Sequence, residues 1–236
     1  MMKRANRNIK FLAIAFATMI GMIFSSLSAQ AQVAPRENEI AAYKGLLKAA
    51  HEGNVAELEK LIKAGANIEQ TDSHDRTAFH IAGFAGNHAI MRALAKAGAD
   101  VNALEDGIYD VVTIAAVAND VETMKVALEL GNKATNVTSI YDGTALIAAA
   151  HLGHFEVVQT LIDAGAPLDH VNNLHWTALI ESVVLGDGGE NHQKTAQALV
   201  DAGASKTLAD KFARTPLDLA KSRGYEAMVK ILEMGE

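Results

Sequence analysis

Apolar residues recur along most of the chain with the spacing of amphipathic helices. Val157, Val158, Leu161 and Ile162, for example, place four apolar side chains on one face of a predicted helix. Because glycine adopts a left-handed backbone at low cost, it commonly ends helices. Glycines end such stretches at spacings of 33, 33, 34 and 38 residues, at Gly65, Gly98, Gly131, Gly165 and Gly203. The pattern therefore predicts a regular series of helices.

A second marker follows the same period. Further glycines divide each period into two predicted helices, at Gly53, Gly86, Gly153, Gly186 and Gly224. A threonine stands before the first of these helices in Thr77–His80, Thr144–Ile147, Thr177–Ile180 and Thr215–Asp218. Its oxygen can cap the helix, since the first N–H groups of a helix have no partner within it. Two markers with one period indicate a stacked array, in which neighbouring units bury each other's apolar stripes.

These repeats resemble the ankyrin repeat, whose pattern is T-P-L-H-x-A-A-x-x-G-H, then an apolar helix and G-A-D-V-N. The match is best at Thr77–Asn102 and Thr144–Asp169, and the resemblance covers about residues 38–234. It implies an all-α ankyrin-repeat solenoid of about six helix-turn-helix units with short hairpin loops. The predicted domain is 38–236, with units at about 38–71, 72–104, 105–138, 139–172, 173–207 and 208–236.

Several units depart from the pattern. The first and last lack parts of it, as expected of units that cap a stack. In the third unit Asp110 replaces the threonine and Asn119 replaces the glycine between the helices, which predicts less regular packing and a weak joint. The glycine that usually stands two residues before the threonine is absent, which predicts altered hairpin turns at Asp75, Asp142, His175 and Ala213.

The first 31 residues have the features of a secretory signal peptide. Four basic residues precede an uncharged apolar run of 14 residues, Phe11–Phe24, and Ala29-Gln30-Ala31 has the form of a cleavage site. The run is shorter than the about 20 residues of a membrane-spanning helix, although an uncleaved anchor is the alternative. We expect cleavage after Ala31, a short linker at 32–37, and export to a bacterial periplasm.

Composition and charge narrow the range of functions. Losing the four basic residues of the signal segment changes the formal net charge from −7 to −11, which disfavours binding to nucleic acids and to membranes after signal cleavage. The chain has no cysteine, which excludes disulfides, cysteine nucleophiles and thiolate metal sites. Acidic residues in the predicted hairpins favour a basic or neutral protein or peptide as the partner, and they are Asp72, Asp75, Asp106, Asp142 and Asp210.

The nine histidines form no evident catalytic or metal site, and we expect no cofactor. His151 and His154 are the only close pair, and two histidines without a third ligand are a weak zinc signal. The fifth unit has a Gly-rich insertion, Gly186–His192, which we interpret as an extended turn between helices. Glu181 stands where other units are apolar. It could pair with His151 or with a partner, but we expect it to reach solvent.

Positions outside the repeat pattern define a predicted binding surface. Ankyrin arrays usually bind proteins through a concave face and hairpin tips, so the resemblance implies a non-catalytic binding scaffold. The candidates on the first helices are Phe84, Val117, His151, Leu152, Glu181, Val184 and Leu185. Those at hairpin tips are Arg76, Tyr109, Tyr141 and Trp176, which belong to residue types common at interfaces.

Two alternatives remain open for these residues. The apolar and aromatic side chains could fold back onto the neighbouring hairpin and complete the core. The chain could instead be a small-ligand or metal-dependent enzyme that uses His151, His154, Glu181 and the Gly186–His192 loop. A purely structural role is a third interpretation.

Overall fold

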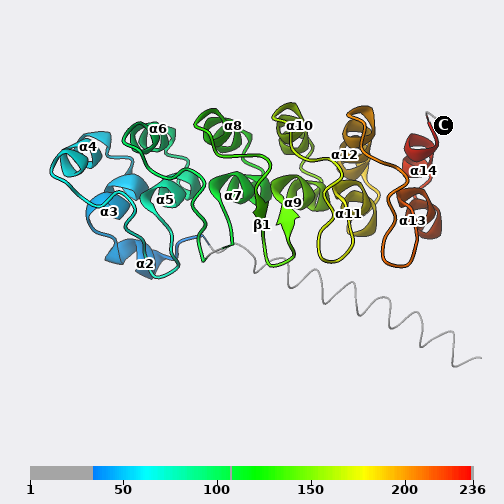
Figure 1. Cartoon of the computed structure of the whole chain (residues 1–236), viewed down its shortest axis with the longest axis horizontal. Coiled ribbons are helices and arrows are strands. Elements are labelled where there is room, and N and C mark those ends of the chain that lie inside the picture. The colour runs from blue at the N-terminus through cyan, green and yellow to red at the C-terminus, as the bar shows by residue number, and fades with distance from the viewer. Residues whose placement is uncertain (1–33, 107, 235–236) are drawn as a thin grey trace, which may run out of the picture. The chain divides into compact units, whose positions relative to one another are not determined.

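The computed structural model describes residues 34–106 and 108–234, so the predicted signal peptide and residues 32 and 33 of the predicted linker lie outside it. The described residues contain thirteen helices and one short hairpin (Figure 1). Strands β1 (Val137–Thr138) and β2 (Gly143–Thr144) pair antiparallel in that hairpin. The helices are α2 (Glu37–Ala42), α3 (Gly45–Glu52), α4 (Val55–Lys63), α5 (Ala78–Phe84), α6 (His88–Lys96), α7 (Val111–Ala118), α8 (Val121–Glu129), α9 (Ala145–Leu152), α10 (Phe155–Asp163), α11 (Ala178–Val184), α12 (Glu190–Asp201), α13 (Pro216–Arg223) and α14 (Glu226–Glu233).

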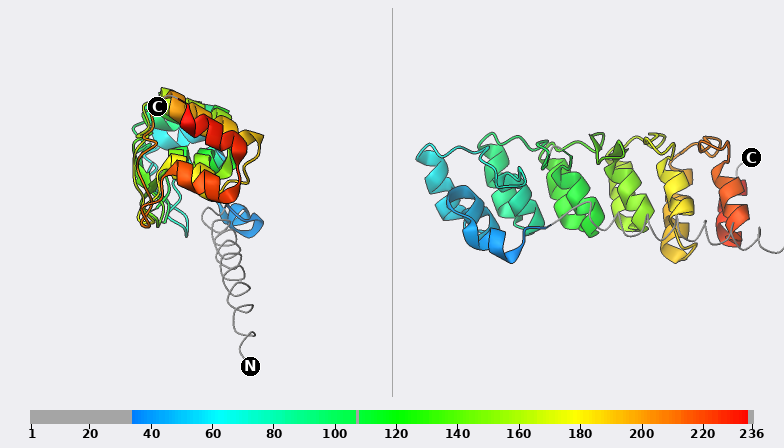
Figure 2. Two further views of the ribbon diagram at one scale, coloured as in Figure 1. Left: turned by 90° about the vertical axis from the view of Figure 1, so that its right-hand side faces the viewer. Right: turned by 90° about the horizontal axis from the view of Figure 1, so that it is seen from below.

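Helices α3 to α14 form six antiparallel pairs that stack side by side. The first helices of the pairs contact one another in chain order, from α3 through α5, α7, α9 and α11 to α13. The second helices form another row beside them, and the hairpin loops all extend to one side of the stack (Figures 1 and 2). The predicted all-α solenoid of six helix pairs is confirmed.

Local capping explains where the first helices begin. The side chains of Thr77, Thr144 and Thr177 each accept a hydrogen bond from the backbone N–H three residues later. In the third unit the Asp110 carboxylate accepts the same bond, and Asn119 ends α7 with a left-handed φ of 55°. Helices α7 and α8 contain 8 and 9 residues, as do α9 and α10. The predicted irregularity of this unit is therefore wrong, because both replacements perform the local role of the residue they replace.

The hairpin turns keep their geometry without glycine. In the second unit the Asp72 Oδ1 atom accepts hydrogen bonds from the backbone N–H groups of His74 and Arg76, at 2.9 and 3.1 Å. Such bonds from a side chain to its own turn stabilise a conformation that the backbone alone disfavours. The four non-glycine residues adopt φ values of 54°, 53°, 63° and 58°, at Asp75, Asp142, His175 and Ala213. The predicted alteration of these turns is wrong.

The core lies between the two rows of helices and continues from unit to unit. Small residues at equivalent positions of neighbouring first helices are buried, which lets the helices approach closely. They include Ala115, Ala116, Ala149 and Ala150. The aromatic-poor composition of the chain is therefore explained by packing between closely spaced helices.

One helix lies outside the repeat. Helix α2 precedes the first pair and starts where the predicted linker ends. None of its six residues is buried. Its Glu39 carboxylate pairs with Arg76 and His74 in the hairpin of the second unit. A helix this short is unstable alone, so α2 depends on these contacts with the array.

Candidate partner-binding surface

The C-terminal ends of four adjacent first helices carry a strip of mostly apolar side chains. The residues seven positions after the N-caps of α5, α7, α9 and α11 are Phe84, Val117, His151 and Val184. In the fourth and fifth units they are followed by Leu152 and Leu185. We call these six residues the first-helix row. Because α5, α7, α9 and α11 contact one another in order, the row runs across four units. Leu152 is 40% exposed and the other five are half-buried, so the row is accessible to a partner.

Two of the predicted contact residues also contribute to the core. The half-buried side chains of Trp176 and Val184 pack against the buried residues of the array. Trp176 therefore folds back from its hairpin, as the alternative interpretation of the sequence proposed. Tyr141 lies in the neighbouring hairpin and is half-buried.

Arg76 and Tyr109 are buried and are not open to a partner. The Arg76 side chain is 1% exposed, and its guanidinium group forms ion pairs with Asp72 Oδ2 at 2.7 Å and Glu39 Oε2 at 2.9 Å. The expectation that these two side chains stand exposed at hairpin tips is therefore wrong. For Arg76 the physical reason is that α2, which the repeat pattern does not predict, supplies a carboxylate that neutralises and covers it.

The hairpins carry exposed apolar side chains that sequence reasoning missed. Their exposed fractions range from 37% to 67%, and we call them the hairpin row: Leu104, Val137, Ile140, Val171 and Phe212. The Phe212 ring has two cations near it, with Lys211 Nζ and Arg214 Cζ at 5.3 and 5.1 Å from its centre. The signal for these residues was available in the sequence, because each is a large apolar residue inside a turn segment that is otherwise mostly polar.

Glu181 is buried on the first-helix face, which corrects the expectation that it reaches solvent. Only 3% of the residue is exposed. Its Oε1 atom accepts a hydrogen bond from Asn172 Nδ2 at 3.0 Å, whereas Oε2 has no hydrogen-bond partner in the described part of the chain. His151 Nδ1 lies 3.7 Å from Oε2, so the predicted neighbour is present but beyond hydrogen-bond range.

Burial controls the protonation of this pair. Burial raises the pKa of Glu181 to about 8, and the hydrogen bond from Asn172 opposes that rise only in part. The pKa of His151 is lowered, chiefly by burial and then by the nearby His192. Both side chains are therefore predominantly neutral at pH 7. A buried polar atom without a hydrogen-bond partner costs about 1–3 kcal/mol of folding free energy. The buried carboxyl group of Glu181 therefore does not contribute to stability.

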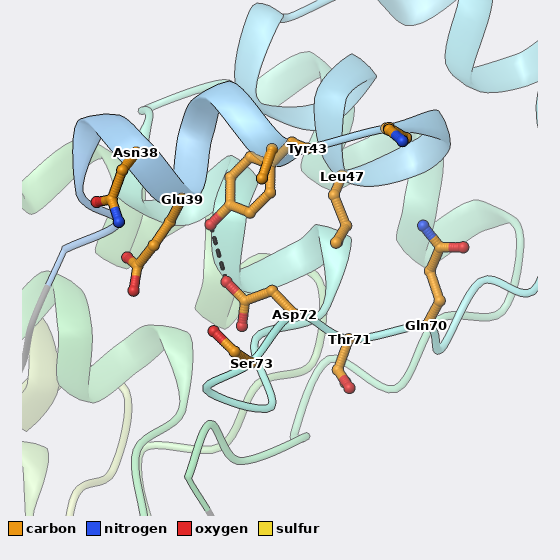
Figure 3. Close-up of a pocket in the computed structure, with 10 residues that line it drawn as sticks. Asn38, Glu39, Tyr43, Leu47, Gln70, Thr71, Asp72 and Ser73 are labelled. Carbon is orange, nitrogen blue, oxygen red and sulfur yellow. Dashed lines mark hydrogen bonds between the residues drawn. The ribbon is translucent and has the colours of Figure 1, made fainter.

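A cavity of about 540 Å³ lies between α2 and the hairpin of the second unit (Figure 3). Glu39 and Tyr43 line it from one side, and Thr71 and Asp72 line it from the other. The Tyr43 hydroxyl donates to Asp72 Oδ2 at 2.8 Å, and burial together with this bond raises the pKa of Tyr43. The polar groups of the cavity thus connect α2 to the array.

Comparison with known proteins identifies the repeats. Residues 112–210 match the family model for ankyrin repeats in three copies, and residues 74–106 match that for a single ankyrin repeat. The chain is 30% identical to the ankyrin repeat protein YahD of Escherichia coli (strain K12) over 187 residues, which cover 79% of this chain and 92% of YahD. The chain belongs to the ankyrin-repeat family.

Solved structures show the same architecture. The ankyrin repeat domain from Acinetobacter baumannii AYE is 37% identical, with a TM-score of 0.74 over 79% of this chain and 95% of that domain. A structure of a predatory endopeptidase from Bdellovibrio bacteriovorus in complex with an immunity protein contains a further similar chain. There the identity is 20% and the TM-score 0.67, over 82% of this chain and 99% of that one, so the likeness concerns the fold alone.

The fifth unit of this ankyrin array contains the Gly-rich insertion, and its side chains contact one another. His192 Nδ1 lies 2.9 Å from Asp187 Oδ1, and His192 Nε2 lies 3.0 Å from the backbone oxygen of His151. The Tyr225 hydroxyl donates to the backbone oxygen of Gly186 at 3.1 Å. The extended turn predicted for Gly186–His192 therefore holds for Gly186–Gly189, whereas Glu190–His192 form the first turn of α12. The inserted residues lengthen α12 to 12 residues, compared with 9 in α10.

The proposed alternative metal site does not assemble in the array. Within residues 34–106 and 108–234, no three acidic or histidine side chains are grouped so that they could coordinate a metal ion. The ring of His154 instead contacts the backbone oxygen of Ala116, with Nδ1 at 2.9 Å. In the same part of the chain, every helix is too short or too polar to cross a bilayer.

Proposed function

We propose that this ankyrin-repeat protein is a non-catalytic scaffold that binds a basic or neutral protein or peptide through its first-helix face and hairpins. Ankyrin repeats indicate a protein–protein interaction scaffold. The observation that carries the proposal is the first-helix row, an accessible strip that crosses four adjacent units. Apolar surface of this kind, with polar groups around it, is typical of protein-binding sites.

Charge supports the expected class of partner. Exposed carboxylates stand in successive hairpins, at Asp75, Asp106 and Asp142. Carboxylates at the edge of a binding surface attract basic partners and repel acidic ones. A basic or neutral partner therefore fits the surface better than an acidic one.

The first test replaces the two leucines of the row. The purified protein is used to capture partners from extract of the source cells, and these are identified by mass spectrometry. The double variant Leu152→Ser and Leu185→Ser is expected to weaken binding of the main partner by about 10- to 100-fold, because both apolar contacts are lost. Binding is measured by titration calorimetry with the identified partner.

Two controls make this test specific. Met234→Ser changes an exposed apolar residue after α14 and should leave affinity unchanged. The far-UV circular dichroism of the double variant should match that of the parent, since neither leucine is fully buried. Trp176 is left intact because it packs against the core. Unchanged affinity of the double variant would contradict binding through the first-helix row.

We further propose that the protein acts in a bacterial periplasm. The support is the basic segment, apolar run and Ala29-Gln30-Ala31 sequence at the start of the chain. Expression of the full chain in the source bacterium is expected to give periplasmic protein whose first residue is Gln32. Cell fractionation and mass spectrometry of the N-terminal peptide check this. A cell-associated product that still contains residues 1–31 would contradict cleavage.

A further inference from the structure

The carboxyl group of Glu181 has one satisfied oxygen and one available oxygen. Oε1 accepts the hydrogen bond from Asn172, while Oε2 is buried without a hydrogen-bond partner among the described residues. The second, third, fourth and sixth units place an apolar residue at this position, for example Ile81 and Ile114. The repeat itself therefore does not require a carboxyl group here, and the packing provides only half of its partners.

The side chain next to the available oxygen is not held in place by a hydrogen bond of its own to any described residue. The His151 side chain is 25% exposed, its Nδ1 lies 3.7 Å from Oε2, and its ring makes no hydrogen bond within the described part of the chain. Burial and His192 lower the pKa of His151, so the neutral ring does not repel a cation. Outward rotation of this ring would open Oε2 toward the first-helix row.

The charged groups on the helices packed against α11 have other partners or point to solvent. On α9, His151 is the group that faces Glu181. On α12, Lys194 forms an ion pair with Glu190. Asp201 accepts a hydrogen bond from Gln197, and the His192 ring contacts Asp187. On α13, Lys221 pairs with Glu233, Asp218 accepts from Thr215, and Arg223 is exposed. A cation for Glu181 must therefore come from outside the array.

We propose that Glu181 receives a basic side chain of the protein partner, with arginine preferred over lysine, and that the carboxyl proton passes to solvent when the ion pair forms. This inference rests on the proposed protein-binding function and names the chemistry that the partner supplies. A guanidinium group is more weakly hydrated than an ammonium group and enters a buried site more readily. The apolar stem of the arginine would lie against apolar residues of the first-helix row, since Leu185 stands one helical turn after Glu181 and Leu152 follows His151.

Coupling between the cation and the proton gives a direct measurement. Burial raises the pKa of Glu181 to about 8 in the free protein. A cation that binds only the ionised form lowers the apparent pKa, by about one unit when its concentration is roughly ten times its Kd for that form. The expected signature is thus a downward shift of one carboxyl titration.

The test follows the Glu181 side-chain carboxyl by carbon-13 NMR during a pH titration of the full chain. The probe is N-acetyl-arginine amide, and N-acetyl-citrulline amide, its neutral analogue, is the control at matched ionic strength. The Glu181→Gln variant identifies the signal by removing it. We expect the arginine amide to lower the apparent pKa of Glu181, and the citrulline amide to leave it unchanged.

A second buried carboxyl provides an internal control. Burial raises the pKa of Glu105 to about 7, but this residue stands in the hairpin before α7, outside the first-helix row. Its titration should not respond to the arginine amide. Equal effects of both probes on Glu181, or an equal shift at Glu105, would overturn the inference. The titration does not use the natural partner, so it can fail while the leucine variants still show protein binding.

Discussion

Arg76→Leu is expected to reduce the free energy of unfolding by about 3 kcal/mol, because it removes one member of a buried ionic cluster. The Arg76 side chain is 1% exposed, and its loss leaves the Asp72 and Glu39 carboxylates without the cation that they contact at 2.7 and 2.9 Å. Replacing that cation by leucine also removes one of the ion pairs that attach α2 to the array. Urea denaturation followed by circular dichroism measures the change.

The sixth unit offers a matched control for this variant. Arg214 forms the same contact with Asp210, four residues earlier in a hairpin, at 2.6 Å. The Arg214 side chain is 48% exposed, however, and it pairs with one buried carboxylate, whereas the buried Arg76 pairs with two. Arg214→Leu is therefore expected to reduce stability less than Arg76→Leu. Similar losses in both variants would contradict the stabilising role assigned to burial of Arg76 beneath α2.

Glu181→Gln is expected to stabilise the protein by roughly 3–5 kcal/mol at pH 8 and by almost nothing at pH 4.5. The carboxyl has its ordinary pKa of 4.5 in the unfolded chain, whereas burial raises the pKa to about 8 in the folded chain. Glutamine has the shape of the protonated carboxyl and does not ionise. Urea denaturation of both proteins at intervals between pH 4 and pH 9 measures the difference.

The sign of this dependence follows from proton binding. Between the two pKa values the unfolded chain has released the Glu181 proton and the folded chain still binds it. At Glu181, folding therefore takes up a proton, and the contribution of this residue to stability falls as the pH rises from 4.5 toward 8. Above pH 8 the carboxyl is ionised in both states, so the difference between variant and parent should stop growing.

Comparison of two variants isolates the carboxyl group. Other titrating residues, such as Glu105, are present in parent and variant alike and cancel in the difference. Glu181→Leu introduces the residue found at the equivalent position in α13, which is Leu219. Its stability difference from the parent should vary with pH in the same way as that of Glu181→Gln, with a different constant added at every pH. A stability difference that does not vary with pH would show that Glu181 is not buried in its neutral form.

Features that depend on neighbours in sequence were predictable from the sequence. The threonine caps, the glycines after the second helices and the apolar stripe of each helix act within a few residues, and their period indicates stacked pairs. The two errors at this level concern replacements. Asn119 and Asp75 adopt left-handed conformations that were expected to require glycine, because asparagine and aspartate tolerate them better than most residues.

The candidate site was predictable in position but not in environment. Repeat spacing placed Phe84, Val117 and Leu152 on adjacent first helices, and the structure leaves them accessible. The spacing alone did not decide whether Trp176 packs against the core or extends outward, and it did not select the hairpin residues, such as Ile140, whose apolar side chains stand exposed. Exposure of one side chain depends on the size and orientation of the residues beside it, which lie in other units.

The sequence by itself determined the repeat, the number of units and the row of first helices, because these depend on helical periodicity and local capping. Only the tertiary structure decided the state of the charged residues. Arg76 is neutralised by Glu39, 37 residues earlier, and Glu181 is buried next to His151 of the preceding unit. Desolvation and pairing of a charge depend on distances between such separate segments, and one segment's residue pattern does not contain those distances.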